Sequence, residues 1–409
     1  MKRPGFLLAA LVAALALAGS ASAGNPFGIR LVRFAPGTTP AQMRVAVTSA
    51  GGVVVTDLSA IHALAAVSRS PGFASRLDAD RRVVASFEDS TLGAELGSAD
   101  TEPVPDPWHE LDSFFGVTNP EGILQWDDNR MNVPAAWATT TGDASVRVAV
   151  LDTGVEDAHR ELKDSVDPSL GGNFIPCDLL VRQYGAQVVS AYGLRDCSSG
   201  DKEGHGTWVA SRIAGAANGF ASNGAAPGVR IGSYKVLAAG FGGLTSWILS
   251  GLLDACTAHR VDIVNMSIVG YMDPADPSTA EDYLLFTDAV SYCRSQGVAV
   301  FAAAGNEHVR VDRVELSLGG RTLAGVGRVT PGPEGFATAS PGSDSLAGYD
   351  LRGLLMVPGG VPGVEMVSAT ANAIGAAPAD VPLRWQVHVG ARDQLAYYSN
   401  YGPRIDLAA

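Results

Sequence analysis

Val146-Arg-Val-Ala-Val-Leu-Asp152-Thr-Gly154 is the stretch from which the fold of this 409-residue chain can be worked out. Aliphatic residues dominate its first six positions, and an acid and a glycine turn follow. Such nearly continuous apolar runs are typical of strands that are buried on both faces of a parallel sheet. Because the binding crevice of an open α/β sheet lies outside the carboxyl ends of its strands, Asp152 is predicted to lie at the rim of a site.

Further apolar runs alternate with helical patterns along the rest of the chain. This alternation predicts an α/β fold with a parallel, doubly wound sheet that helices cover on both faces. Ser267 and Asn306 also fall at the ends of such runs, so they are predicted to share the rim with Asp152. The Gly- and Pro-rich segment 309–358 is interpreted as an insertion outside the core. The further apolar runs that are expected to form the parallel strands are residues 229–237, 261–267, 298–304 and 364–369.

Residues 24–95 show a different pattern, which predicts a small α+β domain. Strands are expected at 29–34, 52–58 and 64–67, a helix at 40–50, and a further helix and strand that end near Phe87. The acidic, Pro-containing stretch 96–121 is interpreted as an exposed linker, and residues 122–409 as the large domain. With 46% hydrophobic residues the chain can bury a full core in both domains.

The N-terminus indicates export. Lys2 and Arg3 precede an apolar run at 6–18 and the small residues 21–23, the pattern of a signal peptide over residues 1–23. A transmembrane anchor is the weaker reading, because that run is shorter than the roughly 20 residues that span a bilayer. The expected localisation is therefore secreted and extracellular. The formal net charge of −13 argues against nucleic acid or an anionic membrane as partner.

Four cysteines permit two disulfides in an oxidising compartment. Cys177 with Cys197 is the preferred pair, because the two bracket a polar, Gly- and Ser-rich loop. Cys256 and Cys293 lie in apolar helical patterns and are equally consistent with buried thiols. No Cys/His spacing of a zinc site occurs, so no metal ligands are assigned.

An acid, a base and an amide donor are all predicted at the rim. His205 lies in Gly204-His-Gly-Thr207 at the start of an alanine-rich helix, and Asn306 follows the strand-like run 298–304. Acyl transfer by a serine nucleophile requires these three groups beside the nucleophile. A helix-start histidine and a strand-end turn residue are the alternative structural interpretations of His205 and Asn306.

The order of these motifs resembles a family. Asp152-Thr-Gly, Gly204-His-Gly-Thr-Trp-Val-Ala, Asn265-Met-Ser-Ile, Ala302-Ala-Ala-Gly-Asn306 and Tyr398-Ser-Asn-Tyr-Gly-Pro resemble the subtilisin-like serine proteases, or subtilases, from about Trp126 onward. Residues 29–88 resemble the inhibitory propeptide that precedes such enzymes. The resemblance implies a secreted zymogen of a serine endopeptidase.

The resemblance also assigns roles. His205 would be the general base, Asp152 would hold its tautomer, and Asn306 would donate to the oxyanion. One cleft segment would pair with the extended backbone of the substrate, and a second cleft segment would form a wall of the primary specificity pocket. The resemblance implies an enzyme of broad specificity that prefers apolar side chains. Plain core packing is the alternative for each of these residues. They are Ser267, Ile268, Val269 and Gly270 in the first segment, and Ala303, Ala304 and Gly305 in the second.

The nucleophile is the departure from the family pattern. The family's Gly-Thr-Ser-Met-Ala segment would follow Ala409, where the sequence ends, so the large domain is expected to be incomplete and inactive as written. Ser345 matches no nucleophile motif. A catalytically dead secreted binding protein on the same scaffold is the alternative, whereas an aspartic protease would need a second Asp-Thr-Gly.

Partners follow from the same resemblance. Protein or peptide substrates and the chain's own propeptide, acting as an intramolecular inhibitor, are expected, and the protein is expected to be a monomer. No cofactor is required by this chemistry. Calcium is often bound in the family, but the sequence indicates no ligand set.

Overall fold

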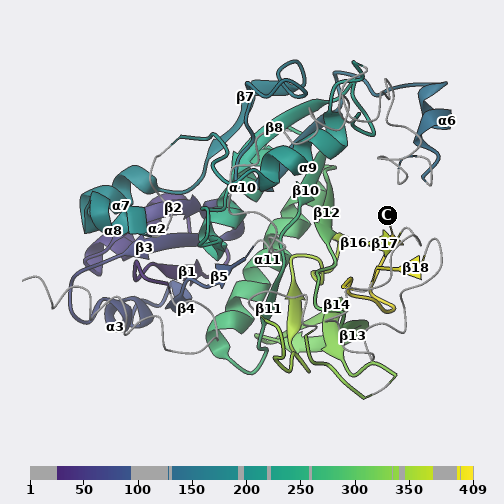
Figure 1. Cartoon of the computed structure of the whole chain (residues 1–409). Helices are drawn as coiled ribbons and strands as arrows, with labels where there is room; N and C mark the ends of the chain where they lie inside the picture. Colours follow the sequence, from purple (N-terminus) through teal and green to yellow (C-terminus); the bar gives the residue numbers. More distant parts are fainter. Residues whose placement is uncertain are drawn as a thin grey trace, which may run out of the picture.

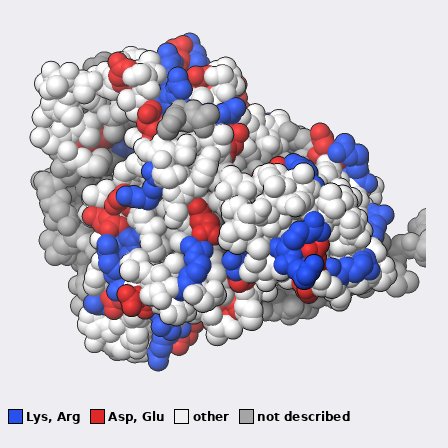
Figure 2. Space-filling model, turned by 180° about the vertical axis from the view of Figure 1, so that it is seen from behind, with Lys and Arg blue, Asp and Glu red and all other residues white. Residues whose placement is uncertain are grey.

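The computed structural model describes residues 25–93, 128, 131–191, 198–218, 223–257, 260–333, 335–339, 346–371, 394–396 and 398–408. The expected signal peptide 1–23 and linker 96–121 lie outside these ranges, as does Ser345. In the described part, no helix is long and apolar enough to cross a membrane. Lys, Arg, Asp and Glu side chains are interspersed on the face that Figure 2 shows.

A seven-stranded parallel sheet forms the centre of the large domain (Figure 1), which confirms the predicted α/β fold. The strands β6 (Arg147–Asp152) and β10 (Ile263–Met266) pair in parallel at its middle, with Val148 opposite Ile263. Each predicted apolar run lies on one of its strands. From edge to edge the order is β19 (Leu407–Ala408), β16 (Glu365–Ser368), β12 (Ala299–Ala303), β10, β6, β8 (Arg230–Lys235) and β7 (Val166–Asn173).

Helices cover both faces of this sheet because β6 presents apolar side chains on both faces. Val148 and Val150 pack with Val209 of α9 (His205–Ala214) on one face. Leu151 packs on the other face in the cluster that contains α10 (Thr245–Cys256) and α11 (Pro277–Ser295). The sheet is therefore doubly wound, and α9 begins at the carboxyl end of β6.

The N-terminal unit, residues 25–93, is built on an antiparallel sheet of order β2-β3-β1-β4. Side chains of β1 alternate: Val32 and Phe34 pack against the unit's own helices, whereas Leu31 joins the core shared with α10 and α11. The unit therefore lies with one sheet face on these two helices (Figure 1). Its elements are β1 (Arg30–Phe34), α2 (Pro40–Ser49), β2 (Val53–Leu58), η1 (Ser59–Ile61), β3 (Ala63–Val67), α3 (Phe73–Asp78) and β4 (Val83–Glu88).

The segment 309–358 lies outside the parallel sheet, as expected, but it forms a sheet of its own. A long hairpin, β13 (Arg310–Leu318) and β14 (Arg321–Thr330), joins β15 (Leu355–Val357) and β11 (Gly270–Met272) in an antiparallel sheet. Its buried Val311 and Val326 show that the insertion packs as structure and is not a loose loop.

The remaining elements are short. Two of them, β5 (Thr91–Leu92) and β9 (Gly243–Leu244), pair with each other and connect the N-terminal unit to the large domain. The others are α6 (Val133–Trp137), α7 (Cys177–Tyr184), α8 (Ala186–Ala191), β17 (Thr370–Ala371) and β18 (Gln394–Leu395).

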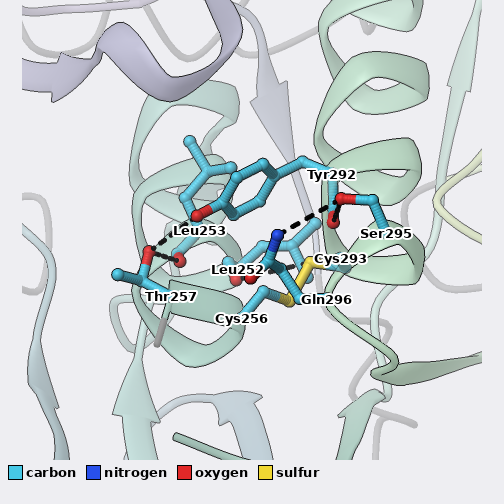
Figure 3. Close-up of a disulfide and its surroundings, with 8 residues drawn as sticks. All are labelled: Leu252, Leu253, Cys256, Thr257, Tyr292, Cys293, Ser295 and Gln296. Atoms are coloured by element: carbon cyan, nitrogen blue, oxygen red, sulfur yellow. Dashed lines mark hydrogen bonds between the residues drawn. A yellow bond between two sulfur atoms is a disulfide. The ribbon is translucent and has the colours of Figure 1, made fainter. Parts of the chain in front are cut away.

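The cysteines settle an alternative that the sequence left open. Cys256 and Cys293 form a disulfide between the last turns of α10 and α11 (Figure 3), so the interpretation as buried thiols is wrong. Apolar helical patterns hid the bridge because both sulfurs lie in a fully buried contact between two helices. Cys177 is also disulfide-bonded, and its preferred partner, Cys197, lies outside the described residues.

Candidate active site

Asp152 and His205 meet at the carboxyl end of β6. The Asp152 carboxylate is fully buried, and its Oδ1 lies 2.7 Å from Nδ1 of the His205 imidazole. Oδ1 also accepts from the Thr153 amide at 2.7 Å. An Nδ1 proton donated to Asp152 would leave Nε2 of the ring free to accept a proton.

Two glycines allow this close approach. A Cβ on Gly206 would lie 2.1 Å from the Gly154 carbonyl oxygen and 3.1 Å from Oδ1 of Asp152. Gly154 has a φ of +106°, and a Cβ there would lie 2.6 Å from the Ser199 carbonyl oxygen. Glycine at 206 therefore lets the first turn of α9 pack on the end of β6, and glycine at 154 makes room for the backbone of residues 199–201.

Asp201 is a site residue that the sequence analysis missed. Its buried Oδ1 accepts from the Gly204 amide at 2.9 Å and the Thr153 hydroxyl at 2.9 Å, while Oδ2 accepts from the amide and hydroxyl of Thr207 at 2.9 and 2.7 Å. Gly204, the N-cap residue of α9, has no side chain that could accept from the first amides of the helix. Asp201 accepts these hydrogen bonds instead. An acid four residues before a helix-start histidine was the signal that could have revealed it.

The carboxylates around His205 shape its titration. Burial lowers the pKa of the imidazole, but the hydrogen bond and charge of Asp152, with the charges of Glu203 and Asp201, raise it above the ordinary value overall. Burial raises the pKa of Asp201, yet its backbone and hydroxyl donors bring it below the usual range. Burial and the charge of Asp201 raise the pKa of the half-buried Glu203 to about 7. The imidazole therefore lies among three carboxyl groups.

The turn that carries Asn306 follows β12, two strands from β6 in the sheet. Asn306 is half-buried, and its neighbour Glu307 is fully buried. The buried Asn400 holds the turn: its Nδ2 donates to the Ala304 carbonyl and to Oε2 of Glu307, each at 2.7 Å, and its Oδ1 accepts from the Val309 amide at 2.9 Å. Asn400 and Glu307 are the second set of residues that the sequence analysis missed.

The second predicted cleft segment, residues 303–305, lies in this same turn. Gly305 has a φ of +92°, and a Cβ there would lie 2.5 Å from Oε2 of Glu307. Ala304 is buried beside Val269 in a small apolar cluster, and Ala303 ends β12. The hydroxyl of Tyr271, the residue that follows the first cleft segment, also donates to Glu307.

The first predicted segment is paired with the tail of the N-terminal unit. The Val269 amide donates to the Gly93 carbonyl at 3.3 Å in an antiparallel bridge. A Cβ on Gly270 would lie 2.3 Å from the Leu92 side chain, which is 3% exposed. Ile268 packs into the main core, and the Ser267 hydroxyl accepts from the Asn265 side chain at 3.2 Å.

A strand on the other side of the tail was not foreseen. In β9, Leu244 lies opposite Thr91 and Gly243 opposite Leu92, in antiparallel register. The tail residues 91–93 thus run as an extended strand between β9 and Val269, with backbone pairing on both sides. This is the arrangement in which a peptide adds to exposed strand edges.

A model of the Subtilase family matches residues 143–409, which is more than half of the chain. This chain belongs to the subtilase family. The subtilase match spans Asp152, His205 and Asn306 and both predicted cleft segments, and the family is one of serine proteases. In the described residues, no cluster of three or more His, Cys, Asp or Glu side chains could hold a metal ion.

The sequence identity between this chain and individual subtilases is low. The chain is 31% identical over 198 residues to the major intracellular serine protease of Bacillus subtilis, which covers 48% of this chain and 52% of that protein. It is 29% identical over 192 residues to the minor extracellular protease Epr of the same organism, covering 47% and 25%. The chain thus spans about half or less of the length of these curated relatives.

A solved structure extends the likeness in fold. The epidermin leader peptide processing serine protease (EpiP) of Staphylococcus aureus superposes with a TM-score of 0.62 at 18% identity, covering 93% of this chain and 74% of that chain. At this identity the likeness concerns the fold alone. Its coverage extends well beyond the residues that the family model matches.

Proposed function

We propose that the protein is a secreted serine endopeptidase made as a zymogen, in which residues 25–93 act as an inhibitory propeptide. The pairing of the tail with β9 and Val269 carries this proposal. A strand in this position excludes substrate from the same edges, because a strand edge pairs with one partner at a time. The N-terminal unit stays in place because its sheet also shares a core with α10 and α11.

The chemistry follows from the Asp152–His205 pair. His205 takes the proton of the serine hydroxyl as it attacks the peptide carbonyl, and later returns it to the leaving amine. Asp152 holds the imidazole and stabilises its cation, and Asn306 donates to the oxyanion. We assign no serine nucleophile among the described residues. A binding protein on the same scaffold is the less favoured alternative.

Substrates are proteins or peptides that lie extended across the rim, in the place of residues 91–93. Leu92 packs against Gly270 and is almost fully buried, which supports an apolar preference at that position. Residues 1–23 would direct export, and the mature enzyme would act as a monomer. Calcium is retained as an expectation without assigned ligands.

Covalent labelling tests the reaction class. A fluorophosphonate reagent is applied to residues 1–409 and to a form extended through a Gly-Thr-Ser segment after Ala409. We expect one labelled serine in the extended form and none in the shorter one. Failure of the extended form to label at any serine, with the fold intact, would favour the binding protein.

Replacing Leu92 tests the zymogen. Leu92→Ala in the extended form removes apolar contact at the cleft, so the propeptide should leave more readily and labelling should become several-fold faster. Val84→Ala is the matched control, because Val84 is 50% exposed in the same unit. Equal labelling rates in both variants would argue against a tail that blocks the cleft.

A further inference from the structure

Asp89 lies where the N-terminal unit leads into the cleft. It is 1% exposed, and its Oδ1 accepts from the Ser246 amide in the first turn of α10 at 3.1 Å. The Thr245 amide donates to the Ser90 carbonyl at 2.8 Å, so the two residues just before the tail both bind the beginning of α10. The other Asp89 oxygen, Oδ2, is buried without a hydrogen-bond partner among the described residues.

Asp282 brings a second carboxylate to the same place from α11. Both helices cross over between parallel strands, so they run in the same direction, and the Cys256–Cys293 disulfide fixes their last turns together (Figure 3). Asp282 precedes Cys293 by eleven residues, as Thr245 precedes Cys256, which places it level with the first turn of α10. Asp282 is 0% exposed.

No cation compensates this pair in the described part of the chain. The Ser90 hydroxyl and amide act to lower the pKa of Asp282, but neither oxygen of Asp282 has a partner with hydrogen-bond geometry among the described residues. Asp276, which caps α11, adds a further negative charge. Glu281, next along α11, is held by Arg33 of β1 in a bidentate pair of 2.6 and 2.9 Å. Glu88, beside Asp89, is exposed.

We propose that Asp89 and Asp282 form a proton-dependent latch, which holds the N-terminal unit on the catalytic domain in acid and loosens as the pH rises. Two carboxylates that lack water and cations cannot both carry a charge at low cost. One residue belongs to the proposed inhibitor and the other to the enzyme, so their protonation acts directly on docking. The biological meaning of this latch rests on the proposed zymogen.

The direction follows from linkage. Burial raises the pKa of Asp89 from 3.8 to about 7, and burial with the Asp89 charge raises the pKa of Asp282 well above 3.8. The docked state therefore binds more protons than the undocked one from about pH 4 upward. Docking is strongest below that pH and weakens by up to about tenfold per pH unit for each proton released, as the pH rises to about 7.

Hydrogen exchange of the intact chain measures the latch without requiring catalysis. The wild type is compared at pH 5, 6 and 7.5 with Asp89→Asn/Asp282→Asn, whose side chains do not titrate. Comparison at one pH cancels the intrinsic exchange rate. The wild-type to variant ratio of protection in β4 and β5 should fall at least about tenfold from pH 5 to pH 7.5. Asp57→Asn, on the exposed surface of the same unit, should leave the profile of the wild type unchanged.

Three results would overturn the proposal. A pH-independent ratio would show that the carboxylates do not release protons on undocking. Loss of protection in β6 and β12 of the double variant would show a general structural role. Calcium that restores wild-type protection at pH 7.5, with no effect on the double variant, would show that a cation holds the pair. The proposed peptidase could fail its labelling test with the latch intact, so the two failures are distinguishable.

Discussion

Asp201 and Asp282 are both buried carboxylates of one chain, but their surroundings are opposite. Asp201, 8% exposed, accepts from three backbone amides and two hydroxyls around the first turn of α9. Asp282, 0% exposed, has no partner with hydrogen-bond geometry in the described part of the chain and faces a second acid, Asp89. The pKa of Asp201 is accordingly lowered and that of Asp282 raised. Donors, and not burial, decide whether a buried acid keeps its charge.

The two kinds of buried acid lie in two different regions of the molecule. At the rim of the sheet, charges are fixed by hydrogen bonds, which holds His205 against Asp152 at 2.7 Å. At the junction between the N-terminal unit and α10, three of the four oxygens of Asp89 and Asp282 have no hydrogen-bond partner among the described residues, and the proposed latch depends on their protons. A permanent site requires the first arrangement, and a removable domain can use the second.

The largest effect should come from the rim. In the form extended through the serine segment, His205→Ala should lower peptide hydrolysis on the order of 10⁴-fold, because the general base is lost. Turnover of a peptide substrate is the measurement. His159→Ala, a histidine outside the rim, is the control and should keep most of the activity. Comparable losses in both variants would contradict the assignment of His205.

Much of this rim could be predicted because its signals are local. A continuous apolar run that ends in Asp152 and a glycine-flanked His205 each determine their own element, and parallel strands bring their carboxyl ends to one edge. The strands of the N-terminal unit were likewise predictable from alternation, since Val32 and Leu31 face different layers.

The rest depends on contacts between distant residues. Asn400 holds a turn almost a hundred residues earlier, and Asp282 meets Asp89 only because α11 packs beside α10. The disulfide between Cys256 and Cys293 has the same origin. No periodicity records which helices become neighbours. The role of β9 was also missed, because a two-residue strand carries almost no pattern.

The next largest effect tests the hydrogen-bonded acid. Asp201→Asn keeps the shape of the side chain but replaces one acceptor oxygen with an NH₂ group, which faces other hydrogen-bond donors. We therefore expect the free energy of unfolding at pH 7 to fall by about 2 kcal/mol. Urea unfolding measures it. The folded pKa of Asp201 is depressed, so its stabilisation is present above the ordinary value of 3.8 and is lost as the pH falls below it. A cost that is unchanged under acid would mean that the charge of Asp201 is unimportant.

The unpaired acid should give the opposite sign. Asp282→Asn removes a buried carboxyl whose ionisation burial and Asp89 disfavour, so at pH 8 it should raise the free energy of unfolding by about 1 kcal/mol. At pH 4.5, where the carboxyl of the wild type is already protonated, the two proteins should unfold at similar urea concentrations. Asp288→Asn, on the same helix and paired with Arg321 at the surface, is the control and should not stabilise at either pH. Destabilisation by Asp282→Asn at pH 8 would place Asp282 with the paired acids.

The smallest expected effect lies between the two kinds of acid, at Glu203. Burial lowers the pKa of His205 and Asp152 raises it, and the charge of Glu203 makes a smaller contribution that also raises it. Burial and the charge of Asp201 raise the pKa of Glu203 itself to about 7. Glu203→Gln removes that charge, so the imidazole should lose its proton at lower pH. Because His205 must be neutral to act as base, the acidic limb of kcat/KM in the extended form should move to lower pH. The shift should be small, since Glu203 is only half-buried and solvent screens it.

Lys202→Gln, the exposed neighbour, is the control for a local change of charge, and it should move the acidic limb in the other direction or not at all. An acidic limb that moves upward in Glu203→Gln would show that Glu203 does not act on His205 through its charge.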